Sequence, residues 1–116
     1  MGLRSAKKSL YYQQRYEPVF EAAKKALSDG GFIVQSIDEK SGIMKAYTGV
    51  SFRSYGENII ITVLKTEKGI HVTAYSKARA AICDWGKSRE NVNRFFAALH
   101  GQLHPKRVKS SFSQFE

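Results

Sequence analysis

The chain has 116 residues, which suits one domain, and its 42% apolar and 25% charged residues exclude wholesale disorder. A single cysteine excludes an internal disulfide scaffold, and no apolar run approaches the roughly 18 residues that a membrane-spanning helix needs. The net charge is +9, and the excess of basic residues lies in residues 1–25 and 77–109. Such basic segments favour anionic partners, and the lack of a signal peptide pattern makes the cytoplasm the expected compartment.

The first third of the chain predicts a strand followed by a helix. Residues 1–9 are expected to form a flexible basic lead, and Ser9–Tyr16 a short edge strand rich in tyrosine. Pro18 suits the first turn of a helix, and Gly30 suits its end. Between them, apolar side chains recur on one helical face at Val19, Phe20, Ala23, Ala26 and Leu27.

Four more strands are predicted to follow this helix. Their ranges are Phe32–Ile37, Ile43–Tyr47, Asn58–Thr66 and Ile70–Tyr75. The connections after the first and third strands are short turns, so consecutive strands are expected to pair antiparallel. Alternation in the last strand places Ile70, Val72 and Ala74 on one face. The other face of that strand carries His71, Thr73 and Tyr75.

A second amphipathic helix is predicted in the last third. Its apolar stripe consists of Val92, Phe95, Phe96, Leu99 and Leu103. Pro105 prevents its extension, and residues 105–116 are expected to form a flexible basic tail. The sequence thus predicts one α+β domain over residues 10–104, of order β-α-β-β-β-β-α. Both helices should cover one face of an antiparallel sheet of four to five strands.

Gly86, Lys87 and Ser88 form the tripeptide that ends a phosphate-binding loop. Such a loop also needs a glycine at the position of Ala81, because its backbone adopts conformations that a Cβ forbids. The tripeptide is therefore interpreted as a turn before the last helix, with Asp84 or Ser88 as the N-cap.

Four segments of the chain resemble known proteins: SGIMKA, SYGENIIITV, IHVTAYSKA and CDWGKSRENVNRFF. Together they resemble a group of small bacterial domains of unknown function. In these domains a strand with Gly-Glu precedes an Asp-Trp-Gly-Lys turn, an asparagine and the last helix. The resemblance covers about residues 10–103, and its most specific part is Asp84–Asn91. It implies a helix-grip-like fold, with the last helix across a curved sheet, and it implies no particular activity.

The sequence contains no clear catalytic or metal-binding constellation. His100 and His104 have the spacing of a metal-binding pair, but Gly101 stands where a zinc hydrolase has its glutamate. The pair is interpreted as surface histidines near a helix end. No nucleophile has an identifiable base beside it, and Cys83 reads as a small buried side chain. We therefore expect no enzyme activity, no metal and no cofactor.

The leading functional hypothesis is a non-catalytic binding or interaction domain. A crease between the last helix and the sheet would hold a small apolar ligand. Its predicted lining consists of Ile61, Phe95, Phe96 and Leu99. The alternative for these four side chains is that they fill the core.

The rival hypothesis is binding of nucleic acid or an anionic surface by basic side chains. Its candidates at the start of the last helix are Lys87, Arg89 and Arg94. Lys87, Arg94 and the acidic Glu90 are expected to point into solvent. The candidates on the arms are Lys7, Lys8, Lys106, Arg107 and Lys109. Five aromatic residues could offer stacking surfaces or pack within the fold: Tyr11, Tyr12, Tyr47, Phe52 and Tyr55. The helix, sheet, helix order also resembles double-stranded-RNA-binding domains, although this chain has an extra strand.

Overall fold

A computed structural model describes residues 5–48, 57–78 and 87–103 of the chain. Its elements are β1 (Ser5–Tyr12), α1 (Tyr16–Asp29), β2 (Ile33–Asp38), β3 (Ile43–Tyr47), β4 (Glu57–Thr66), β5 (Gly69–Ala78) and α2 (Lys87–Leu103). The predicted α+β class and the order β-α-β-β-β-β-α are therefore confirmed. The helix-grip arrangement, which is a finer statement, stays a prediction.

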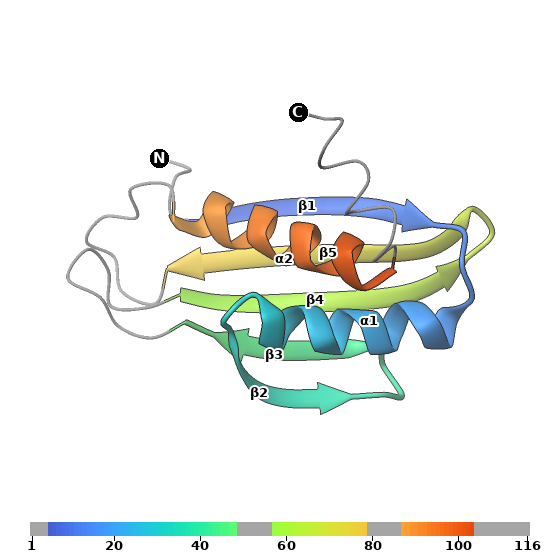
Figure 1. The fold of residues 1–116 in the computed structure, drawn as a ribbon, viewed down its shortest axis with the longest axis horizontal. Helices are drawn as coiled ribbons and strands as arrows, with labels where there is room; N and C mark the ends of the chain where they lie inside the picture. Colours follow the sequence, from blue (N-terminus) through green and yellow to red (C-terminus); the bar gives the residue numbers. More distant parts are fainter. Residues whose placement is uncertain (1–4, 49–56, 79–86, 104–116) are drawn as a thin grey trace.

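All neighbouring strands pair antiparallel in one sheet of order β1-β5-β4-β3-β2 (Figure 1). The meander from β2 to β5 matches the prediction. β1 then pairs along its whole length with β5, from Ser5 opposite Lys77 to Tyr12 opposite Ile70. The first and last strands in sequence are thus neighbours, and β1 and β2 form the two edges of the sheet.

The position of β1 corrects the predicted strand over residues 9–16 and shortens the predicted lead over residues 1–9. The strand covers Ser5–Tyr12, and Tyr16 already belongs to α1. Four of the five residues from Ser5 to Ser9 are polar or charged, which hid the strand from an argument based on apolar alternation. Backbone hydrogen bonding with β5 does not depend on the type of side chain, and lysines are common on exposed edge strands.

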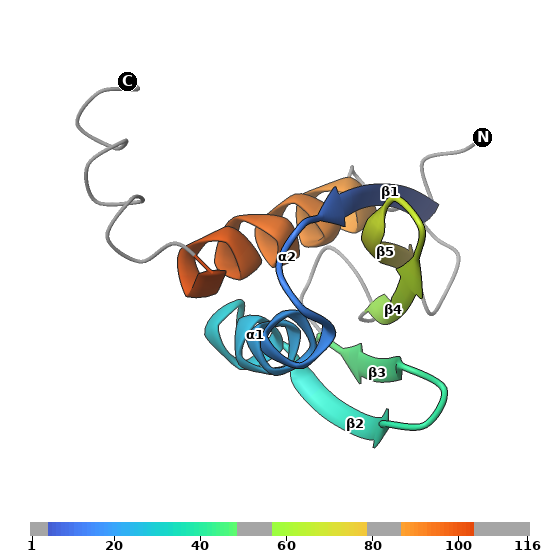
Figure 2. The same ribbon diagram turned by 90° about the vertical axis from the view of Figure 1, so that its right-hand side faces the viewer.

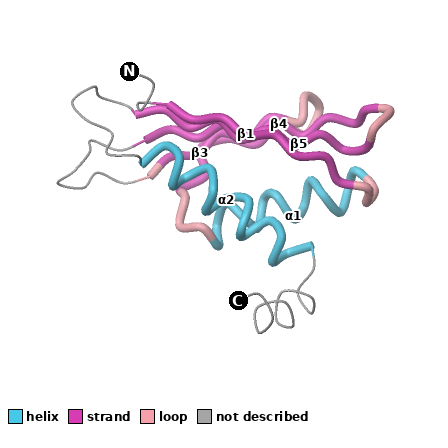
Figure 3. The backbone as a smooth tube through the Cα atoms, turned by 90° about the horizontal axis from the view of Figure 1, so that it is seen from above, coloured by secondary structure: helices cyan, strands magenta, loops and turns pink. Residues whose placement is uncertain are grey.

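Both helices cover the same face of the sheet, so the molecule has two layers (Figures 2 and 3). α2 lies over β1 and β5, while α1 contacts β4 and β2. Side chains that alternate along the strands enter the space between the layers, as the pleat requires. The predicted apolar face of α1 is buried there, and so are Ile59, Ile61 and Val63 of β4. No helix among the described residues is long and apolar enough to span a membrane.

A tight turn joins β2 to β3 where the sequence predicted one, over Asp38–Gly42. The Oδ1 atom of Asp38 accepts hydrogen bonds from the backbone N–H groups of Lys40 and Ser41, at 3.1 and 3.3 Å. Gly42 has φ of 75°, and its backbone passes so close to the Val63 carbonyl that a Cβ would collide with it. Glycine is therefore required at this position.

Candidate functional site

The four residues predicted to line a ligand crease belong to the hydrophobic core. Ile61, Phe95 and Leu99 are fully buried, and Phe96 is 2% exposed. The Phe95 and Phe96 rings pack edge to face, with centroids 5.2 Å apart. None of the four lines either of the two cavities described below. Their burial supports the core-filling alternative over a ligand crease.

Arg94 does not point into solvent, which corrects the prediction for this side chain. Its Nε atom donates a 2.8 Å hydrogen bond to the Gly30 carbonyl, and Nη2 donates to Asn91 Oδ1 at 3.2 Å. Its guanidinium lies over the Phe32 ring, 4.8 Å from the centroid. The carbonyl at the end of α1 thereby gains a charged donor, which helix ends favour. Arg94 thus joins the two helices through its Nε and Nη2 donors.

The other basic candidates do not form one cluster. Lys7 and Lys8 alternate on β1, so they point to opposite faces of the sheet. Lys8 lies on the helix side, with Nζ 5.7 Å from the centroid of the Phe96 ring. Arg89 is exposed on α2. The side chain of Lys87 and all of Lys106, Arg107 and Lys109 lie outside the described residues.

A buried polar network at one end of the sheet was not predicted. Glu57, Ser76 and Asn91 come from β4, β5 and α2, and each is at most 1% exposed. The Asn91 Nδ2 atom donates to Glu57 Oε1 and to Ser76 Oγ, both at 3.3 Å. Arg94 extends the network to the end of α1 through Asn91 Oδ1.

Thr48 closes the same network from the β3 side. Its hydroxyl donates to Glu57 Oε1 at 2.8 Å and accepts from the Glu57 backbone N–H at 3.0 Å. A buried carboxylate requires such donors, because burial removes its hydration. The network therefore ties the starts of β4 and α2 together, and it lines neither described cavity. The Gly-Glu pair at Gly56-Glu57 and the asparagine at Asn91 belong to the resemblance described above. They are the sequence signal that could have indicated this network.

Tyr12 and His100 form a second polar contact, partly buried between β1 and α2. The Tyr12 hydroxyl lies 2.7 Å from His100 Nε2. Burial raises the pKa of Tyr12, because the phenolate would lose its hydration. His100, predicted as a surface residue, is thus half-buried and bonded. His104 lies outside the described residues, which contain no group of three or more side chains suited to a metal ion.

Tyr12 is expected to stay protonated at a pH where exposed tyrosines have lost their protons. A phenol ionises near pH 10 in the unfolded chain, so the stabilisation from the neutral phenol is complete below that pH and is lost as pH rises above it. Burial and the nearby carboxylates of Glu17 and Glu39 also raise the pKa of Tyr16. Phenolate absorbance during an alkaline titration should therefore show a late component that becomes smaller in Tyr12→Phe. A late component of unchanged size in this variant would contradict the assignment.

The sheet face opposite the helices, which we call the open face, is covered by no described element (Figure 3). Residues paired across neighbouring strands share a face. One row across the sheet reads Lys7, Tyr75, Ile60 and Lys45. The next row reads Ser5, Lys77, Asn58 and Tyr47, and a third reads Ser9, Thr73, Thr62 and Ile43.

Lysines and aromatic rings share the open face. Lys7, Lys45 and Lys77 are all exposed. Near the other end of β1, Tyr11 is 47% exposed and stacks on His71, with ring centroids 4.6 Å apart and 27° between the planes. Of the predicted stacking residues, Tyr11 and Tyr47 lie on this face and Tyr12 lies on the opposite one. Phe52 and Tyr55 lie outside the described residues. Tyr75, which was not among them, lies near the centre of the face.

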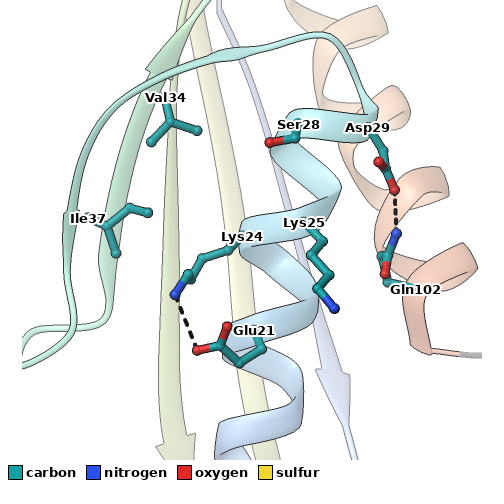
Figure 4. A pocket seen from close by; sticks show the side chains of 8 residues that line it. All are labelled: Glu21, Lys24, Lys25, Ser28, Asp29, Val34, Ile37 and Gln102. Carbon is teal, nitrogen blue, oxygen red and sulfur yellow. Dashed lines mark hydrogen bonds and ion pairs between the residues drawn. The ribbon is translucent and has the colours of Figure 1, made fainter.

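Two cavities occur at the periphery of the described structure. A groove of about 400 Å³ lies between α1 and β2, with Val34 and Ile37 facing the helix (Figure 4). In it, Lys24 pairs with Glu21 at 3.2 Å, and Gln102 donates a hydrogen bond to Asp29. The second cavity, about 350 Å³, lies between residues 13–17 and the β4–β5 turn. Four of the six polar side chains that line the groove thus pair with one another, and we assign no ligand to it.

Comparison with known proteins adds a distant structural likeness. No family model matches the chain, and no curated protein matches it. The chain is similar to the crystal structure of protein CV1439 from Chromobacterium violaceum, with 12% sequence identity and a TM-score of 0.44. The match covers 83% of this chain and 94% of that one.

Proposed function

We propose that this protein is a non-catalytic binding domain whose binding surface is the open face and whose partner is a polyanion. The observation that carries the proposal is the arrangement of Lys7, Lys45 and Lys77, which project from three strands onto one uncovered face. Among the described residues of that face, the one carboxylate is Asp38, at the end of β2. Its Oδ1 atom already accepts two backbone hydrogen bonds in the turn.

The two faces of the sheet have different roles, and this difference supports the proposal. The helix side buries the core and the polar network, so the fold does not depend on the lysines of the open face. Lysines spread over a surface attract anions through their summed field, which weakens as salt screens it. Strongly basic composition, with a net charge of +9, adds long-range attraction for the same partner.

Removing the three open-face lysines should weaken polyanion binding. The face variant carries Lys7→Gln, Lys45→Gln and Lys77→Gln in the full chain, and heparin serves as a polyanion without bases. Its dissociation constant at low salt should rise on the order of 10- to 100-fold, and the slope of log affinity against log salt should fall by about two. Isothermal titration at several salt concentrations measures both quantities.

A control variant with the same charge change separates the face from net charge. Lys25→Gln, Lys65→Gln and Lys68→Gln remove three exposed lysines from α1 and the β4–β5 hairpin. This variant should bind heparin within about threefold of the parent, because only long-range attraction changes. Equal losses in the two variants, or no loss in the face variant, would reject the open face as the binding surface.

A further inference from the structure

We infer that the polyanion recognised by the open face is a single-stranded nucleic acid, with unpaired bases stacked on its tyrosines. The inference rests on the proposed function and names its partner. Phosphates alone would require only lysines. The open face instead interleaves lysines with aromatic rings, which is the combination that binds single strands without strict sequence preference.

The aromatic rings of the open face include the exposed Tyr11 and the partly exposed Tyr75. Tyr11 is exposed and stacks on His71 through one of its ring faces, so the pair forms a platform at the end of β1. Tyr75 lies between Lys7 and Ile60, in the row that ends at Lys45. Unpaired bases can stack on such rings, whereas bases within a duplex already stack on each other.

The width of the sheet argues against a duplex as the partner. Neighbouring strands are about 4.8 Å apart, so β1 to β2 extends over roughly 19 Å, wider than the roughly 12 Å major groove of B-DNA. The open face therefore cannot enter a groove to read base edges. A duplex would contact the lysines through its phosphates and leave the tyrosines unused.

Polar side chains between the rings provide donors and acceptors for the edges of unpaired bases. Asn58 lies between Lys77 and Tyr47, and Thr73 lies between Ser9 and Thr62. The Ser9 and Thr73 hydroxyls are 3.0 Å apart and exposed, so each retains bonding capacity toward a ligand. On this face the lysines can contact the phosphate backbone of a single strand. The tyrosines, amides and hydroxyls can contact its bases.

The test compares labelled single-stranded RNA with a hairpin duplex of equal charge, by fluorescence anisotropy on the full chain at moderate salt. The parent should bind the single strand at least tenfold more tightly than the duplex. The ring-deletion variant Tyr11→Leu with Tyr75→Leu should lose on the order of tenfold in affinity for the single strand for each ring removed. The matched variant Tyr11→Phe with Tyr75→Phe keeps both rings and should bind like the parent.

The outcomes separate the inference from the proposed function. Equal binding of single strand and duplex, unchanged in the ring-deletion variant but weakened in the face variant, would overturn the single-strand partner and leave the polyanion surface standing. Binding that resists both sets of substitutions would overturn both. Vesicles containing an anionic phospholipid should bind more weakly than the single strand, and the opposite order would likewise overturn the inference.

Discussion

The Phe95→Ala variant is expected to unfold with a free energy about 3 to 5 kcal/mol lower than the parent. Phe95 is fully buried on α2, where its ring packs against Phe96. Truncation removes apolar burial and leaves a cavity that the neighbouring side chains only partly fill. Urea unfolding followed by circular dichroism measures the change, and the slope with urea should stay constant if the fold is retained.

Asn93→Ala is the control for the Phe95 prediction, because Asn93 is exposed on the same helix. That substitution should change the free energy of unfolding by no more than about 0.5 kcal/mol. Near-parental stability of Phe95→Ala would mean that the ring projects over a ligand crease. The same variant thus decides between the core and crease interpretations of Phe95.

The Asn91→Leu variant is expected to lose about 2 to 3 kcal/mol of unfolding free energy. Leucine has a similar volume but withdraws the Nδ2 donor from Glu57 and Ser76 and the Oδ1 acceptor from Arg94. The largest part of the loss comes from the Glu57 carboxylate, which remains buried with one donor fewer.

A double-mutant cycle isolates that contribution. Glu57→Gln keeps the length of the side chain and an acceptor for the Thr48 hydroxyl, but it removes the charge. In this background Asn91→Leu should cost about 1 kcal/mol less than in the parent, as measured by urea unfolding. The same cost in both backgrounds would show that Asn91 does not support the carboxylate.

Periodicity was sufficient to predict most elements of the fold. Alternation of Ile59, Ile61 and Val63 marks β4, and the apolar stripe of α2 marks a helix whose buried side the structure confirms. The start of β1 was not predictable in this way. Lys8 interrupts the apolar alternation of Ala6 and Leu10 on its helix side, and pairing with β5 completes the strand.

The candidate site was harder to predict from the sequence than the fold, because its residues come together only in the tertiary structure. Helical spacing alone placed Arg94 toward solvent, but the carbonyl of Gly30 and the ring of Phe32 come from the segment between α1 and β2. Alternation correctly put Tyr75 on the strand face opposite Val72. Only the strand order, with β1 beside β5 and β3 beside β4, brings Lys7 and Lys45 into the same row of the open face as Tyr75.

The structural and functional proposals depend on each other through the sheet. The core under α1 and α2 and the network around Glu57 hold β1, β5, β4 and β3 side by side. That pairing fixes the spacing of lysines and tyrosines on the opposite face. Substitutions on the open face should therefore change binding with little effect on unfolding, whereas Phe95 and Asn91 substitutions should act mainly on unfolding.

Amide chemical-shift mapping by nuclear magnetic resonance tests the central claim most directly. Uniformly ¹⁵N-labelled full chain is titrated with a short single-stranded RNA, and shift changes are assigned to residues. The account predicts that the largest changes fall on the strands of the open face, around Lys7, Tyr75, Ile60 and Lys45, and that α1 changes little. Changes centred on the helix layer, or none on the sheet at saturation, would contradict it.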